Sequence, residues 1–102
     1  MNPTPPFWIV CIDPTDDPYE RERDPIYRSW EGERFLPIFT DRETADVFIK
    51  GMTDTLVDGE LLSRPIQDDA ATMAVVRFGQ ANRVFSYAVN PVHGQRPSLV
   101  RF

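Results

Sequence analysis

The sequence predicts an α+β fold, with one mixed, mainly antiparallel sheet of four to five strands and two helices packed on one face. Three observations lead to this prediction. Residues 7–12 form a continuous apolar run of β-branched and aromatic side chains, which is typical of a central strand covered on both faces. Residues 41–52 and 69–78 each carry an apolar stripe at helical spacing. Residues 84–89 form a second strong strand pattern, and strands interspersed with helices fit a sheet with helices packed against it.

All 102 residues fit one domain, because a chain of this length can only just enclose one hydrophobic core. Val, Ile, Leu and Phe make up 27 of these residues, a share above the roughly 20% below which chains tend to stay disordered. We therefore expect a single packed α+β domain over residues 1–102, with an extended, proline-rich lead-in at 1–6 and a charged loop at 13–25.

The formal net charge of −5 repels phosphate backbones, so binding to nucleic acid or to an anionic membrane is not expected. The longest apolar run is too short to cross a bilayer, and no basic segment precedes it as a signal peptide requires. The single cysteine, Cys11, cannot form an internal disulfide, and its apolar neighbours predict a small buried side chain. These features predict a cytoplasmic protein.

From Ile26 the pattern predicts a hairpin, with a strand ending at Trp30, a tight turn at 31–33 and a second strand at 34–39. Pro37 cannot donate to a ladder, which places the second strand at an edge or turns that position outward. Thr40 and Glu43 have the spacing of a capping box, so a helix is expected to begin at Asp41 and end near Met52. Its apolar stripe consists of Ala45, Phe48, Ile49 and Met52.

A short strand at 61–66 precedes the second predicted helix, which spans 69–78. Asp68 is expected to cap the start of this helix, and Gly79 is expected to end it in the left-handed conformation. The tail is expected to add a last short strand at 99–102.

The lone histidine, His93, lies beside Gly94 in a predicted loop. Without a second histidine, acid–base or nucleophile-activating chemistry would need carboxylates from elsewhere in the chain. A nucleophile–base pair of Cys11 and His93 would require an exposed Cys11, which its apolar neighbours argue against. We therefore expect His93 to be a surface loop residue, with a functional role as the alternative.

The charged loop carries carboxylates of the kind that calcium prefers. It lacks the spacing and the glycine of an EF-hand, and the interleaved Arg21 and Arg23 would neutralise a cation site. The loop is therefore expected to be a solvated charged segment or a protein-binding one rather than a metal site. Its carboxylates are Asp13, Asp16, Asp17, Glu20, Glu22 and Asp24. The pair Asp68-Asp69 is expected to serve the start of a helix, where the dipole favours negative charge.

Trp30 lies near a predicted turn, where a large aromatic side chain either closes the edge of the core or contacts a partner. The common nucleotide, metal and nucleophile motifs do not occur in the sequence. An enzyme is therefore less expected than a binding protein, and no metal or other cofactor is predicted. The residues expected to contact a partner are Trp30, Tyr19, Asp16, Asp17, Glu20 and His93.

The stretch Phe35-Leu36-Pro37-Ile38-Phe39-Thr40 leads directly into the capped helix from Asp41 to Lys50, and a second helix and a strand ending in Val89-Asn90-Pro91 follow. This pattern resembles the SseB-like domain family associated with enhanced serine sensitivity, over roughly residues 7–91. The resemblance implies a compact α+β domain with no established catalytic activity, a role in interactions and no cofactor.

The sequence thus predicts a non-enzymatic protein-interaction or regulatory module that binds an unknown protein partner or a second copy of itself. Two alternatives stay open. One is a small-ligand-binding protein or enzyme that uses loop carboxylates and arginines. The other is an acidic decoy or immunity-type protein that binds a basic partner through the net charge of −5.

Overall fold

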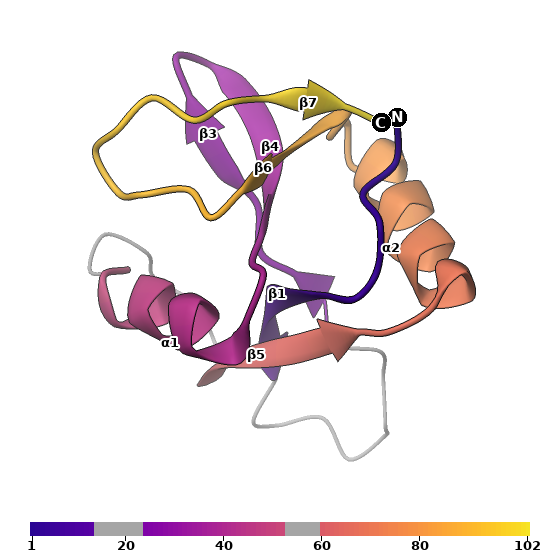
Figure 1. Cartoon of the computed structure of the whole chain (residues 1–102). Coiled ribbons are helices and arrows are strands. Elements are labelled where there is room, and N and C mark those ends of the chain that lie inside the picture. The colour runs from indigo at the N-terminus through magenta and orange to yellow at the C-terminus, as the bar shows by residue number, and fades with distance from the viewer. Residues whose placement is uncertain (14–23, 53–59) are drawn as a thin grey trace.

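The computed structural model describes residues 1–13, 24–52 and 60–102, and it confirms the α+β class (Figure 1). The elements in chain order are β1 (Phe7–Asp13), β2 (Asp24–Pro25), β3 (Arg28–Trp30), β4 (Glu33–Ile38), α1 (Arg42–Lys50), β5 (Glu60–Ile66), α2 (Asp69–Ala81), β6 (Ser86–Val89) and β7 (Val100–Arg101). Within these ranges, neither helix has the length and apolar character needed to cross a membrane.

The strands form two sheets that are joined at one point. β1 lies between β2 and β5 in the first sheet, and the second sheet has the order β3-β4-β6-β7. Trp8 of β1 and Phe39, which follows β4, exchange backbone hydrogen bonds of 2.8 and 2.9 Å. The pairing is mixed and mainly antiparallel, as expected, since β4 and β6 form the single parallel pair among the described strands. The predicted single sheet is thus divided in two and linked through this bridge.

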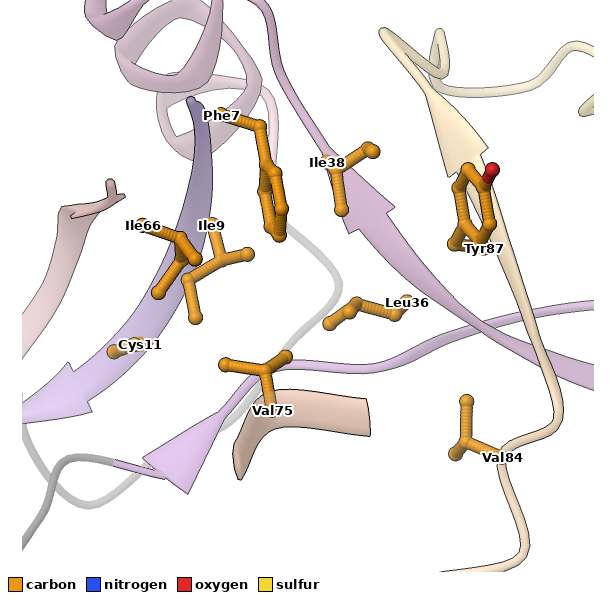
Figure 2. Close-up of a cluster of buried hydrophobic side chains, with 9 residues drawn as sticks. All are labelled: Phe7, Ile9, Cys11, Leu36, Ile38, Ile66, Val75, Val84 and Tyr87. Atoms are coloured by element: carbon orange, nitrogen blue, oxygen red, sulfur yellow. The ribbon is translucent and has the colours of Figure 1, made fainter. Parts of the chain in front are cut away.

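Both faces of β1 are buried, as its continuous apolar run predicts. The odd-numbered residues, such as Ile9, pack with Val75 of α2 in the cluster shown in Figure 2. The even-numbered residues, such as Val10, pack with Phe48 of α1. The prediction that both helices lie on one face is therefore wrong. A strand with two apolar faces needs a cover on each, and the two helices provide one each.

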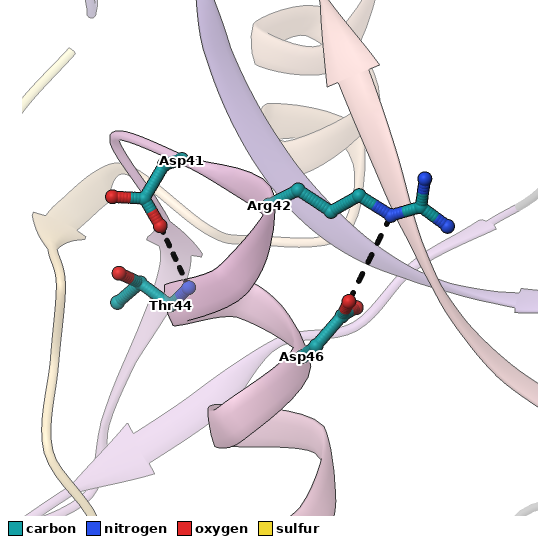
Figure 3. A network of polar contacts seen from close by, with 4 residues as sticks. All are labelled: Asp41, Arg42, Thr44 and Asp46. Carbon is teal, nitrogen blue, oxygen red and sulfur yellow. Dashed lines mark hydrogen bonds and ion pairs between the residues drawn. The ribbon is translucent and has the colours of Figure 1, made fainter.

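The cap of α1 differs by one residue from the prediction. The Asp41 carboxylate, not the Thr40 hydroxyl, accepts the helix-capping bond from the amide of Thr44, at 2.7 Å (Figure 3). The hydroxyl and the amide of Thr44 together hold the pKa of Asp41 below its usual range. Thr40 is instead held by the Asn90 side chain, which accepts from the Thr40 amide at 3.1 Å and donates to its hydroxyl at 3.2 Å. The predicted capping box is therefore replaced by an aspartate cap and a link to the end of β6.

The start of α2 agrees with the prediction, because Asp68 accepts from the Ala71 amide at 2.8 Å. The end does not agree, because the helix continues past Gly79, which is buried inside it. Asn82 caps the C-terminus, with its side-chain amide donating to the Phe78 carbonyl at 2.8 Å, and Arg83 takes the left-handed conformation with a φ of 61°. Gly79 packs against Val84 and Phe102 instead of ending the helix.

The remaining differences lie in the strands around the hairpin. Residues 24–25 of the predicted charged loop pair with β1 as β2. Glu31 and Gly32 both have positive φ, as a two-residue hairpin turn requires. β4 is not an edge strand as Pro37 implied, because it lies between β3 and β6. The ladder with β3 ends at Phe35, so the buried Pro37 falls where β3 no longer pairs. The predicted tail strand is confirmed as β7, which pairs with β6.

Candidate functional site

The structure brings Trp30 and His93 together, although the two residues are far apart in the sequence. Both line an open pocket of about 130 Å³ between the β3–β4 hairpin and the loop that follows β6. The other main lining residues are Arg28, Phe35, Phe48 and Gln95. The loop leaves β6 at the Ile38 end of β4, where the Asn90 amide donates to the Ile38 carbonyl at 2.8 Å, and it reaches the hairpin turn through Arg96, which pairs with Glu31.

His93 anchors the loop to α1. Its ring stacks on that of Phe48, with centroids 4.0 Å apart and planes inclined by 20°. Its Nε2 lies 2.9 Å from the Phe48 carbonyl oxygen, which can only accept, so Nε2 carries the hydrogen. Gly51 permits this approach, because a Cβ at that position would lie 2.7 Å from the Cδ2 of His93. His93 is therefore a structural clamp that holds this loop to α1.

The loop that carries His93 is a local turn tied to the hairpin. Gly94 has a φ of 77°, and the Gln95 amide donates to the Val92 carbonyl at 3.1 Å. An exposed ion pair joins Arg96 to Glu31 in the hairpin turn at 3.1 Å. Exposed pairs of this kind contribute at most about 1 kcal/mol, so the stacked ring of His93 is the stronger attachment.

Trp30 contributes an indole nitrogen with no acceptor among the described residues. Its Nε1 is buried, while the side chain as a whole is half-buried at the pocket. An indole N–H can only donate, and a buried donor without an acceptor costs about 1–3 kcal/mol. A carbonyl or carboxylate oxygen brought within hydrogen-bond distance of this nitrogen would remove the cost.

A second buried polar group without a partner in the described part of the chain lies outside the pocket. The Tyr27 hydroxyl makes no hydrogen bond there. Burial raises the pKa of Tyr27 to about 12, with Arg34 exerting a smaller lowering effect. The guanidinium of Arg34 lies 5.3 Å from the centre of the Tyr27 ring and donates to the Asn82 carbonyl at 2.7 Å, so it also supports the end of α2.

The described lining of the pocket includes the cationic Arg28 and the imidazole of His93 but no carboxylate, so the described residues form no carboxylate–histidine pair there. The described residues also contain no group of three metal-ligating side chains. Cys11 has no exposed surface and packs in the cluster under α2, whereas His93 packs on α1, so the two do not form a nucleophile–base pair. The arrangement fits a ligand that offers a hydrogen-bond acceptor to the indole of Trp30.

The other residues expected to contact a partner cannot be placed. Tyr19, Asp16, Asp17 and Glu20 lie outside the described residues, as does Glu22 of the possible cation site. Asp24 is described and is exposed in β2. Asp68 of the Asp68-Asp69 pair caps α2, in line with its expected structural role.

Sequence reasoning missed Arg28 and Gln95 as lining residues and assigned Phe48 to the core alone. Two turn signals, Glu31-Gly32 and His93-Gly94, could have drawn attention to the two loops. Nothing in the sequence shows that these loops lie side by side, because that depends on contacts between distant residues, such as the ion pair of Arg96 with Glu31 and the stacking of His93 on Phe48.

No protein-family model matches the chain, and no curated protein matches it. The resemblance to SseB-like domains therefore stays a prediction.

Proposed function

We propose that this protein is a non-enzymatic interaction module that receives a segment of a partner protein in the pocket between Trp30 and His93. The observation that carries the proposal is the buried Nε1 of Trp30, which has no acceptor among the described residues and belongs to a side chain that lines the pocket. Tryptophan is enriched among the residues that dominate binding energy at interfaces.

The lining also indicates the chemistry of the partner. Phe35 and Phe48 supply apolar walls, and Trp30 supplies an N–H donor that has no acceptor among the described residues. These features favour a segment that presents an apolar side chain next to a carboxylate or carbonyl oxygen. The anchored His93 keeps one wall in place before binding, which lowers the entropy lost on association.

A peptide-display selection against the wild-type chain tests the proposal. We expect selected peptides to shift the amide resonances of residues 28–30 and 91–95, together with the indole resonance of Trp30. Trp30→Ala should abolish binding. Trp30→Phe, which keeps an aromatic ring but has no N–H, should weaken binding by about 1–3 kcal/mol if the indole donor is used.

Phe85→Ala is the matched control, because Phe85 is a 50% exposed aromatic residue that does not line the pocket. This variant should bind like the wild type. Peptides that bind Trp30→Ala as tightly as the wild type, or that shift resonances elsewhere, would refute the choice of this pocket. Stabilisation by nucleotides, amino acids or divalent ions in a thermal-shift panel would instead favour a small-ligand function.

A further inference from the structure

The outer edge of β5 has no partner strand among the described residues. β5 pairs with β1 along all seven of its residues, and it is the last strand of its sheet. An edge strand presents unpaired N–H and C=O groups that can pair with another chain.

The bonds of β1 show which residues of β5 present these groups. Trp8 and Val10 direct their backbone groups away from β5, because Trp8 bonds with Phe39 and the Val10 carbonyl accepts from Ile26 at 2.8 Å. Backbone groups alternate between the two edges of an antiparallel strand. The odd-numbered residues of β1 therefore bond with β5, and their partners in β5 are the even-numbered ones, such as Leu62.

Leu61 and Ser63 consequently direct their N–H and C=O groups to the outer edge of β5. Pro65, the next residue with this orientation, has no N–H, so the run of donors ends there. The outer edge thus offers a short segment for pairing, with Leu62 at its centre.

We propose that two copies of this chain pair through β5, antiparallel and in a two-fold arrangement centred on Leu62. In this register Leu61 of one copy faces Ser63 of the second copy, and each pair exchanges both hydrogen bonds. The same register places Glu60 opposite Arg64 of the second copy, twice in the dimer. Such self-complementarity is what a two-fold interface requires.

The charges favour this occupant over an unrelated peptide. Glu60 and Arg64 lie four residues apart in β5, opposite Asp13 and Ile9 of β1. Because side chains alternate along a strand, the two lie on the same face of the sheet. Glu60 is exposed and Arg64 is half-buried, and no ion pair joins either of them to another described residue. Opposite charges that face each other across an antiparallel pair stabilise it.

The register is also selected against its nearest alternative. Moving the two-fold centre from Leu62 to Ser63 keeps the orientation of the backbone groups but sets Leu61 opposite Pro65 of the second copy. That pair loses a donor, and the pairing of Glu60 with Arg64 is lost as well.

The neighbouring surface leaves room for the second copy. A hollow of about 450 Å³ lies between α1 and β5, lined by Ile49, Lys50, Leu61 and the ion pair of Arg42 with Asp46 (Figure 3). In the paired sheet both α1 helices lie on the same face, on opposite sides of the two-fold axis. The hollow gives the α1 helix of the second copy space at this junction.

Sedimentation equilibrium tests the proposal with four variants. Ser63→Pro removes a donor from the outer edge without removing a bond to β1, and should raise the dimer dissociation constant by at least about tenfold, whereas Ser63→Ala should not change it. Arg64→Glu should weaken the dimer, and the double variant Glu60→Arg with Arg64→Glu should restore it.

A cross-link provides a test that does not depend on weakening the fold. Leu62 faces itself across the axis as a non-hydrogen-bonded pair, with a Cα separation of about 4.5 Å that a disulfide accepts. In a Cys11→Ser background, Leu62→Cys should therefore form an intermolecular disulfide under air oxidation, whereas Leu61→Cys should form little.

A chain that is monomeric at all concentrations, or a dimer that Ser63→Pro and the charge changes leave intact, would overturn the proposal. A monomer whose edge binds a selected extended peptide, with binding lost in Ser63→Pro, would assign the edge to a foreign segment instead. Trp30→Ala should leave the dimer unchanged, so this test and that of the Trp30 pocket fail independently.

Discussion

Replacing Phe48 with alanine should cause a large loss of stability, because this side chain joins the core to the wall of the pocket. Phe48 is 6% exposed, and its ring contacts that of Phe39 at a centroid distance of 5.1 Å and that of His93 at 4.0 Å. Phenylalanine-to-alanine changes in a core lower the free energy of unfolding by about 3–5 kcal/mol. This loss includes the contribution of each aromatic pair, which is about 0.5–1.5 kcal/mol. Against a total of about 5–15 kcal/mol for a domain of this size, the loss is a third or more of the stability in most of that range.

Urea denaturation measures this effect directly. With a slope of about 1–3 kcal/mol per molar urea, the midpoint should fall by at least about 1 M while the slope stays unchanged. Val47→Ala is the matched control on the same helix, because Val47 is 63% exposed and its truncation should change stability by no more than about 0.5 kcal/mol. A Phe48→Ala variant no less stable than Val47→Ala would show that the inner face of α1 is misassigned, and the stacking of His93 with it.

Four further substitutions test other parts of the structure. Asp41 has a lowered pKa, so it stabilises the fold above its unfolded pKa of about 3.9 and loses this contribution as the pH falls through its lower folded pKa. The difference in unfolding free energy between the wild type and Asp41→Ala, measured in urea, should therefore shrink between pH 7 and pH 2. Tyr27 has a raised pKa of about 12, so its contribution to stability is complete below about pH 10 and is lost as the pH rises towards 12. Tyr27→Phe should remove this loss of stability at alkaline pH. It should not destabilise the protein at pH 7, since it deletes a buried hydroxyl without a partner among the described residues. Gly51→Ala should displace the His93 ring and shift its NMR resonances. Gly79→Ala would place its new Cβ 3.6 Å or more from its nearest neighbours, so it should raise the free energy of unfolding by about 0.4–1 kcal/mol, measured by thermal denaturation.

Local signals in the sequence predicted most of the elements. The apolar run of β1, the stripe around Phe48 and the aspartate before α2 each act through neighbours within one or two turns of chain, so they can be read without the fold. The α1 cap was misplaced by one residue because Thr40 and Asp41 are both good capping residues, and only the contact of Thr40 with the distant Asn90 separates them.

The arrangement of the elements depends on long-range pairing that leaves no local trace. The parallel match of β4 with β6 assembles the second sheet, and the bridge of Trp8 with Phe39 links it to the first. The two-sided burial of β1 places the helices on opposite faces. The candidate pocket has the same origin. Trp30 and His93 could be named separately as loop residues, but their meeting depends on long-range contacts of the loop after β6, such as the stacking of His93 on Phe48.

The position of β1 in the chain has a consequence for synthesis. β1 leaves the ribosome before every other strand, yet its ladder partner β5 begins only at Glu60 and the α2 side chains that cover its odd-numbered residues come later still. Until then the segment from Phe7 to Ile12 is an uncovered, uncharged β-forming stretch, the type of sequence that drives aggregation of nascent chains. Pro6 and Pro14 flank this stretch and limit the length of strand that can pair with another chain. A chain released before β5 is complete should therefore depend on chaperones to stay in solution.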